Sequence, residues 1–243
     1  SNRIARTLCR IDRMPSTDLL LYIFSSTRLP LAVQVGRWVQ ESPRFREFAE
    51  TYRDKIHKKV RTVTDADGYR DLQAELATAY FLVQERRFIV EYEKYGVGKQ
   101  RGPDLSVTYK THIRFDVEVT RLRGSQIGEE GAGPEPSKLV NTLCAKLQQL
   151  PPSIMNVLVL VADDAPYSEE NLTSGLRLLQ ERYEHKDDDF FTRRGFLGSR
   201  DFLRHYSRLS AIRLVAPGGL PVLRLQPQAR HPLPPDLATI LRR

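Results

Sequence analysis

Residues 103–120 have the sequence PDLSVTYKTHIRFDVEVT, and their pattern predicts the central part of the fold. Apolar and polar residues alternate over 105–109 and again over 115–120, which is typical of strands with one buried face. Because only Lys110 to His112 join the two segments, we expect strands around 104–109 and 113–120 to be adjacent and antiparallel. Such a pairing brings two carboxylates, Asp104 and Glu118, onto neighbouring strands.

The flanking sequence predicts one helix before this stretch and one after it. Apolar residues at Leu72, Leu76, Ala79 and Val83 predict a helix over about 69–86, with Glu75 at the margin of its apolar stripe. Residues 88–92 are rich in β-forming types. A helix capped by Ser137 carries leucines up to Leu150, and the continuously apolar run 155–161 predicts a strand buried on both faces. The predicted order is helix, three strands, helix, strand.

The ends of the chain are predicted to add further elements. Helices are expected from Thr17, from Pro30 to Trp38, and along one stripe from Phe45 to Val60, with 62–68 as a connector. Beyond the central order we expect helices over 168–184 and about 202–209, strands over 210–215 and 222–225, and a proline-rich tail. Residues 187–189 are expected to form an acidic turn, and 125–136 a flap. The predicted organisation is a helical extension over 1–61 and a core over 62–243.

Positive charge is concentrated at the start of the chain. Residues 1–61 hold 13 Lys and Arg against 6 Asp and Glu, so seven of the eight net positive charges lie there. A basic region of this kind attracts a polyanion, because neutralising phosphates releases condensed counterions. Arg46, Arg53 and Lys55 lie off the apolar stripe of the third helix, and we predict that they contact nucleic acid.

Several other functions are disfavoured by the sequence. No run approaches the roughly 18 apolar residues of a membrane span, so no membrane partner is expected. The chain begins without the apolar core of a signal peptide, and Cys9 and Cys144 match no metal or redox spacing, which favours a reduced, cytoplasmic protein. The histidines are scattered, and neither a Gly-x-Ser-x-Gly turn nor a dinucleotide-binding glycine motif is present.

The αβββαβ order, with Glu75 on the first helix, Pro103-Asp104 opening the second strand and Glu118 on the third, resembles the PD-(D/E)XK, or restriction-endonuclease-like, nuclease superfamily over residues 69–161. The resemblance implies an α/β fold with a small mixed sheet. It implies that Asp104 and Glu118 bind Mg²⁺ or Mn²⁺ and that Glu75 supplies a further ligand. It also implies hydrolysis of phosphodiester bonds, with DNA favoured over RNA as the substrate. The resemblance is compatible with a homodimer.

One position departs from the family pattern. The family places a lysine two residues after its last carboxylate, where this chain has Thr120. A lysine moved to the following helix would replace it, and Lys146 lies nearer that helix's leucine stripe than Lys138 does. Arg121 and Lys99 are weaker candidates, since Arg121 points to the strand face opposite Glu118. Asp116 shares the face of Glu118 and would assist it.

The loss of the usual lysine keeps a second interpretation open. The chain would then be a nuclease-like fold without catalysis, serving as a nucleic-acid-binding or protein-assembly module. A third interpretation is a protein-interaction module in which the basic start of the chain is incidental. Close approach of several carboxylates predicts at least one raised carboxyl pKa in the metal-free protein.

Overall fold

A computed structural model of the chain describes residues 14–94, 102–123, 136–163 and 167–243. It divides into two compact units, Ser1–Leu76 and Ala77–Arg243. The division falls inside helix α5 (Ala66–Gln84), which contributes its first turns to one unit and its last turns to the other. The boundary expected from the sequence, between residues 61 and 62, comes just before this helix. The flap predicted over 125–136 lies, up to residue 135, outside the described residues.

The first unit is helical. It contains α1 (Ser16–Phe24), α2 (Pro30–Glu41), α3 (Pro43–Thr51) and α4 (Arg53–Thr62), followed by the start of α5. Proline occupies the first turn of both α2 and α3, where its missing N–H has no intrahelical partner to lose. The inward side chains are apolar and buried: Leu19, Ile23, Val35, Phe45, Phe48, Ile56 and Val60.

Two predictions in this unit are wrong. The single helix expected along the stripe from Phe45 to Val60 is two helices, interrupted at Tyr52, whose backbone leaves the helical range at ψ 14°. The apolar spacing continues across the interruption, so the pattern alone does not reveal it. Asp67-Gly68, expected to form the end of the 62–68 connector, lies in the first turn of α5, because the Asp65 carboxylate accepts a 2.7 Å hydrogen bond from Gly68 N and caps the helix.

The second unit is built on a six-stranded mixed sheet, so the protein belongs to the mixed α/β class. Its strands are β1 (Phe88–Tyr92), β2 (Leu105–Tyr109), β3 (Ile113–Leu122), β4 (Met155–Ala162), β5 (Leu209–Val215) and β6 (Val222–Leu225), in that order across the sheet. The pairs β3–β4 and β4–β5 are parallel and the other three are antiparallel. The antiparallel β2–β3 pair and the buried β4 strand are confirmed, as is the order helix, three strands, helix, strand.

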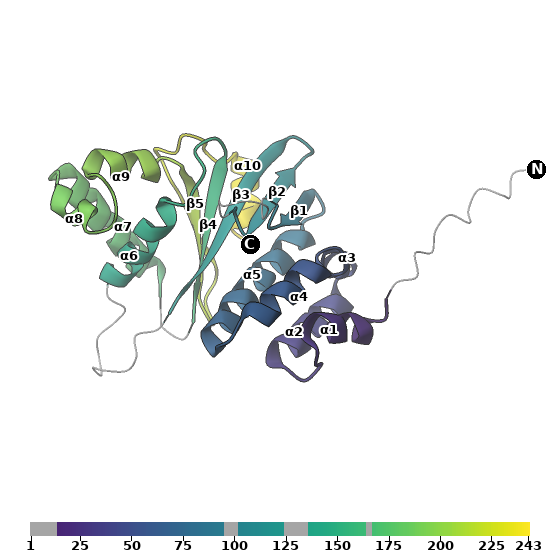
Figure 1. The fold of residues 1–243 in the computed structure, drawn as a ribbon. Coiled ribbons are helices and arrows are strands. Elements are labelled where there is room, and N and C mark those ends of the chain that lie inside the picture. Colours follow the sequence, from purple (N-terminus) through teal and green to yellow (C-terminus); the bar gives the residue numbers. More distant parts are fainter. Residues whose placement is uncertain (1–13, 95–101, 124–135, 164–166) are drawn as a thin grey trace, which may run out of the picture. The chain divides into compact units, whose positions relative to one another are not determined.

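Helices cover both faces of this sheet (Figure 1). α6 (Pro136–Leu147), α7 (Glu169–Glu184), α8 (Asp188–Thr192) and α9 (Ser199–Tyr206) lie on one face, and α10 (Pro235–Leu241) lies on the other. On the α10 face, Arg213 of β5 donates a 2.9 Å hydrogen bond to Leu241 O and stacks on the Phe81 ring of α5. Burial lowers the pKa of Arg213 to about 10.

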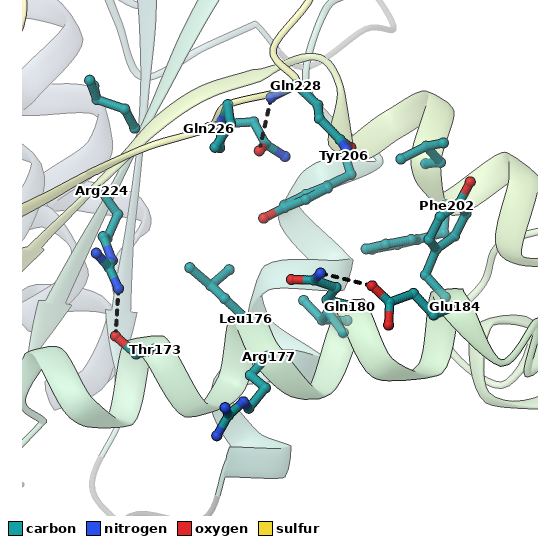
Figure 2. Close-up of a pocket in the computed structure, with 15 residues that line it drawn as sticks. Thr173, Leu176, Arg177, Gln180, Glu184, Phe202, Tyr206, Arg224, Gln226 and Gln228 are labelled. Atoms are coloured by element: carbon teal, nitrogen blue, oxygen red, sulfur yellow. Dashed lines mark hydrogen bonds between the residues drawn. The ribbon is translucent and has the colours of Figure 1, made fainter.

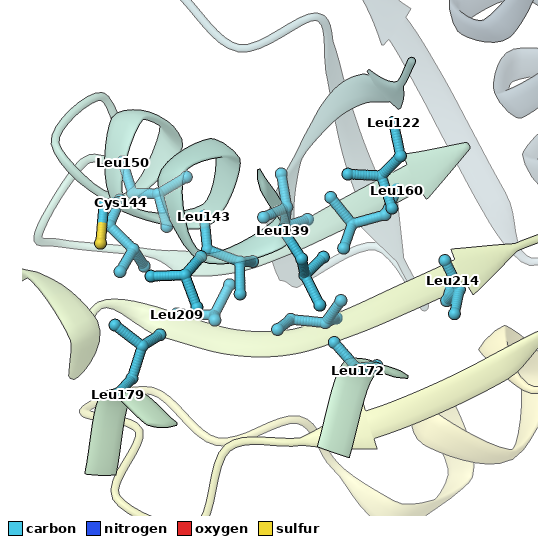
Figure 3. Close-up of a cluster of buried hydrophobic side chains, with 14 of the residues drawn as sticks. Leu122, Leu139, Leu143, Cys144, Leu150, Leu160, Leu172, Leu179, Leu209 and Leu214 are labelled. Carbon is cyan, nitrogen blue, oxygen red and sulfur yellow. The ribbon is translucent and has the colours of Figure 1, made fainter. Parts of the chain in front are cut away.

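The core on the α6 face is a continuous apolar cluster (Figure 3). Alternate side chains of β4 point into it, because successive residues of a strand face opposite sides, and Leu122 of β3 and several residues of β5 join them. The leucines of α6 and the aromatic residues of α8, of α9 and of the segment between them complete it: Leu139, Leu143, Leu147, Phe191, Phe196 and Phe202. The strip of β3 that carries Asp116 and Glu118 lies on the same face as this cluster.

Several boundaries in the second unit differ from the predictions. The helix expected over about 202–209 is α9, Ser199–Tyr206, and Leu209 already belongs to β5. Ser137, expected to cap α6, lies inside its first turn. The acidic turn at 187–189 instead starts helix α8, since the Asp187 carboxylate accepts a hydrogen bond from Phe190 N at 3.0 Å. The proline-rich tail contains α10, because Pro235 is compatible with the first turn of a helix.

Within the described ranges, no helix is both long and apolar enough to cross a bilayer.

Candidate functional site

The register of β2 and β3 brings the predicted carboxylates together. Leu105 pairs with Val117 and Ser106 with Asp116, so Asp104, one residue before the first pair, lies opposite Glu118. Directly opposed residues of an antiparallel pair have Cβ atoms roughly 5 Å apart. We call Asp104, Asp116 and Glu118 the carboxylate row. All three are buried, with exposed fractions of 5%, 5% and 6%.

Asp104 is fixed at the point where β2 begins. Its backbone carbonyl accepts a hydrogen bond from Glu93 N at 3.0 Å, which holds it against the end of β1. Its carboxylate Oδ2 accepts a hydrogen bond from Val119 N at 2.8 Å, so the side chain takes the place of a strand partner beyond the end of β2. Hydrogen bonds from backbone N–H groups stabilise the charged form of a carboxylate.

Glu118 is paired with Lys146, the lysine predicted to replace the one missing at position 120. Lys146 Nζ donates to Glu118 Oε1 at 2.6 Å, and the exposed fractions of the two side chains are 15% and 8%. Lys146 lies in the last turn of α6, beside the leucines that pack on the sheet, and its aliphatic chain reaches back to β3 from there. The helix after the third strand therefore places a cation against the third-strand carboxylate.

Asp116 has a different environment on the same strand face. Ser106 Oγ donates a 2.7 Å hydrogen bond to its Oδ1 across the β2–β3 pair. Burial raises the pKa of Asp116, and the Ser106 hydrogen bond and the positive charge of Lys94 only partly offset that rise. A raised carboxyl pKa was predicted, but its main cause is burial, not repulsion between carboxylates. The contact with Ser106 was not predicted, although Ser106 alternates with Asp104 on the β2 segment.

Glu75 belongs to the first unit. Its carboxylate Oε2 accepts a 2.5 Å hydrogen bond from Lys59 Nζ, and 12% of its side chain is exposed. α4 and α5 are thereby joined by an ion pair. The sequence places Glu75 at the edge of an apolar stripe but gives no signal for this partner, since Lys59 lies 16 residues away.

The weaker candidates to replace the family's lysine, Arg121 and Lys99, are not placed beside Glu118 in the described structure. Arg121 Nε lies 3.0 Å from Asp163 Oδ1, and strand alternation places it on the face opposite Glu118, as predicted. Thr120 follows Glu118 on the same face and pairs with Leu160 of β4. Lys99 lies outside the described residues.

The three predicted nucleic-acid contacts lie on α3 and α4. Arg46 is already engaged, with its Nε 2.9 Å from Glu50 Oε1 and a second guanidinium nitrogen donating to Met14 O at 2.5 Å. The Arg53 guanidinium lies over the Tyr22 ring, and the Lys55 ammonium lies over the Tyr52 ring. Arg53 Nε also lies 3.7 Å from Asp54 Oδ1, a longer contact than that of Arg46 with Glu50.

No three His, Cys, Asp or Glu side chains in the described part of the chain are arranged to hold a metal ion together. The carboxylate row instead offers a pair of opposed carboxylates, Asp104 and Glu118, with a lysine at one of them.

Neither a protein-family model, nor a curated protein, nor a solved structure matches this chain significantly. Fold and site together define a mixed α/β protein in which two adjacent strands carry opposed, buried carboxylates beside a lysine.

Proposed function

We propose that the protein is a metal-dependent nuclease with a restriction-endonuclease-like core, hydrolysing phosphodiester bonds in DNA or, less so, in RNA. The observation that carries the proposal is the 2.6 Å contact between Lys146 Nζ and Glu118 Oε1. It supplies a lysine to a site whose strand has threonine at the expected position. A lysine on a helix surface usually directs its ammonium group to water, whereas Lys146 directs it to a buried carboxylate of β3.

The residues fit a hard divalent cation. Mg²⁺ is commonly held by only one or two carboxylates, with water and substrate phosphate at its other positions, and Asp104 and Glu118 are such a pair. Glu75, which the family resemblance implies as a further ligand, belongs to the first unit, so the proposed site rests on Asp104 and Glu118 alone. Bound Mg²⁺ or Mn²⁺ would provide an acidified water and positive charge at the scissile phosphate.

The chain's own groups have distinct roles in this proposal. Asp104 is oriented by Val119 N, so its carboxylate has a fixed direction before any ligand arrives. Lys146 balances the charge of Glu118 in the resting protein, and its single ammonium on a flexible stem can turn to a phosphate oxygen when substrate binds. There it would stabilise the charge that develops on the phosphate in the transition state.

A second function is favoured by a specific observation. Each carboxylate that the resemblance implies as a ligand already has a polar partner: Glu118 has Lys146, Glu75 has Lys59 and Asp104 has Val119 N. A carboxylate neutralised by lysine is a poorer metal ligand. These contacts suit a nuclease-like fold that binds nucleic acid, or assembles with proteins, without cleaving.

Cleavage of plasmid, single-stranded DNA and RNA, measured across Mg²⁺, Mn²⁺ and Ca²⁺, separates the two functions. We expect products with Mg²⁺ or Mn²⁺. Asp104→Asn and Glu118→Gln should each lower the rate at least 100-fold, since each removes a metal ligand, and Lys146→Met should lower it about 10- to 100-fold.

Two variants serve as matched controls for this assay. Asp189→Asn changes an exposed aspartate, and Lys138→Met removes another lysine from α6, the helix that carries Lys146. Both variants should cleave as the unaltered protein does. A chain that yields no metal-dependent product and no heat of Mn²⁺ binding by calorimetry is the inactive module. A homodimer, which would place two sites on a duplex, is tested by light scattering with and without DNA.

A further inference from the structure

A pocket of about 600 Å³ lies in the second unit, between α7, α9 and the segment that follows β6. Figure 2 shows Leu176 and Gln180 of α7 on one side of it and Gln226 on the other, with Tyr206 and Phe202 of α9 closing one end. Its volume is in the range of pockets that hold small organic ligands.

The pocket contains a buried donor that lacks a partner. Gln226 is 7% exposed, and its Nε2 makes no hydrogen bond to any part of the chain that the structure describes. Its Oε1 accepts only a long hydrogen bond, 3.4 Å, from Gln228 N. A buried amide donor without an acceptor costs free energy, so a ligand that brings an acceptor to this place would recover it.

The walls suit a flat ring. Phe202 and Tyr206 are stacked, with ring centroids 5.3 Å apart, and Leu176 adds an aliphatic surface. The half-buried Tyr206 lies near the Gln226 amide: burial raises the pKa of Tyr206, and the amide partly offsets the rise. Nucleobases stack on aromatic side chains, and amide side chains form hydrogen bonds with the polar edges of the bases.

Positive charge lies at the other end of the pocket. Figure 2 shows Arg224 beside Thr173, and Arg224 donates to Thr173 Oγ1 at 2.8 Å. Its side chain is 41% exposed, and its Nη1 lies 3.8 Å from Glu169 Oε1. The side chain of Arg177, which also lines the pocket, is 80% exposed, with its Nε 3.9 Å from Glu181 Oε1, so a bound phosphate would replace these two long carboxylate contacts. Arginine guanidinium groups bind phosphate through paired hydrogen bonds.

We propose that this pocket binds a nucleoside 5′-monophosphate unit, either as a free nucleotide or as the end of a nucleic-acid strand. The base lies against Tyr206 and Leu176 and gives an acceptor to Gln226 Nε2, and the phosphate lies at Arg224 and Arg177. This site shares no residue with the carboxylate row, so the inference does not rest on the proposed nuclease activity.

Titration calorimetry of the full chain with the four ribonucleoside 5′-monophosphates, their nucleosides and ribose 5-phosphate tests this proposal. At least one monophosphate should bind, and should bind at least tenfold more tightly than its nucleoside and than ribose 5-phosphate, because base and phosphate are held at opposite ends. A 5′-phosphorylated trinucleotide distinguishes the sources: if it binds at least tenfold more tightly than the monophosphate, the ligand is a strand end, and otherwise it is the free nucleotide.

Two variants place the ligand. Gln226→Leu should weaken binding about tenfold while leaving the thermal midpoint unchanged or higher, since leucine removes the unpaired donor from the protein itself. Gln149→Leu, at an exposed position of the same unit, is the matched control and should bind normally. Leu176→Trp should fill the pocket and weaken binding at least tenfold.

The proposal is overturned if no monophosphate binds at millimolar concentration, or if ribose 5-phosphate binds as well as any nucleotide. It is also overturned if Gln226→Leu binds normally. That variant decides the question even if Leu176→Trp fails to fold by circular dichroism. Loss of metal-dependent cleavage in the carboxylate variants, with nucleotide binding intact, would show that the two sites are separate.

Discussion

At the scale of single residues, the Lys146–Glu118 pair links the proposed chemistry to stability. Breaking a buried ion pair from one side leaves an uncompensated charge and costs about 3 kcal/mol. Lys146→Met leaves Glu118, of which 6% is exposed, without its cation, whereas Glu118→Gln leaves a lysine whose long chain can turn toward water. We expect Lys146→Met to lower the free energy of unfolding by about 3 kcal/mol and Glu118→Gln by about 1 kcal/mol, measured by urea denaturation.

The double variant tests whether the two charges act through each other. With both removed, the loss should be smaller than the sum of the single losses, because the unpaired carboxylate is gone. Additive losses, or a larger cost for Glu118→Gln than for Lys146→Met, would contradict a buried, mutually neutralising pair.

Asp116 gives a prediction that depends on pH. Burial raises its pKa in the folded protein, so between the unfolded and folded pKa values the folded protein binds the proton more tightly. The folded state is therefore disfavoured as the pH rises through this window from about 4, the ordinary value for aspartate. Asp116→Asn can still accept a hydrogen bond from Ser106, and it carries no buried charge.

We expect Asp116→Asn to be more stable than the unaltered protein at pH 7, by about 1 kcal/mol, and to lose this advantage below pH ~4. Thermal unfolding of both proteins from pH 3.5 to 8 measures the difference. An advantage that is independent of pH would assign the gain to packing and not to the buried carboxylate.

At the scale of elements, the approach of α7 to α6 depends on a glycine. A Cβ built on Gly175 in the middle of α7 would lie 2.8 Å from Leu139 Cδ2, and Leu139 is buried in the apolar cluster. In an exposed helix, Gly→Ala stabilises by about 1 kcal/mol. Here overpacking should outweigh that gain, so Gly175→Ala should lower the free energy of unfolding by about 1 kcal/mol in urea.

Two further variants show whether the contact with Leu139 is the cause. Ser174→Ala, next to Gly175 but exposed, should be neutral or slightly stabilising. Leu139→Val shortens the opposing side chain, and in its presence Gly175→Ala should cost less. If the cost is the same in both backgrounds, the α6–α7 packing account is wrong.

The elements also show what the sequence can and cannot predict here. The β2–β3 pair was predictable because alternation and a short connection act locally, and Lys146 was preferred because its helical position lies near the apolar stripe. The interruption at Tyr52 was not predictable from apolar spacing, which is the same on both sides of it. The partner of Glu75 depends on how α4 packs against α5, and Gln226 is notable only because folding buries its amide without an acceptor.

In the whole molecule, most of the net positive charge and the carboxylate row lie in different parts of the chain. Residues 1–61 carry seven of the eight net positive charges, and Asp104, Asp116 and Glu118 belong to the second unit. If the basic part binds nucleic acid, the logarithm of the affinity should fall with the logarithm of salt concentration, with a slope of about −0.9 for each phosphate neutralised.

The basic residues of α3 and α4 should contribute unequally to the binding of nucleic acid. The pair of Arg46 with Glu50, at 2.9 Å, is tighter than that of Arg53 with Asp54, at 3.7 Å. Reversal of Arg46 to glutamate should therefore weaken binding of duplex DNA less than reversal of Arg53 and Lys55, which lie over aromatic rings. Arg53→Glu with Lys55→Glu should lower the affinity at least tenfold at about 0.1 M salt and make the salt dependence shallower, measured by fluorescence anisotropy. Arg193→Glu changes an exposed charge of the second unit and is the control. If this control weakens binding as much as Arg53→Glu with Lys55→Glu does, net charge alone attracts the DNA, and the helices α3 and α4 form no specific binding surface.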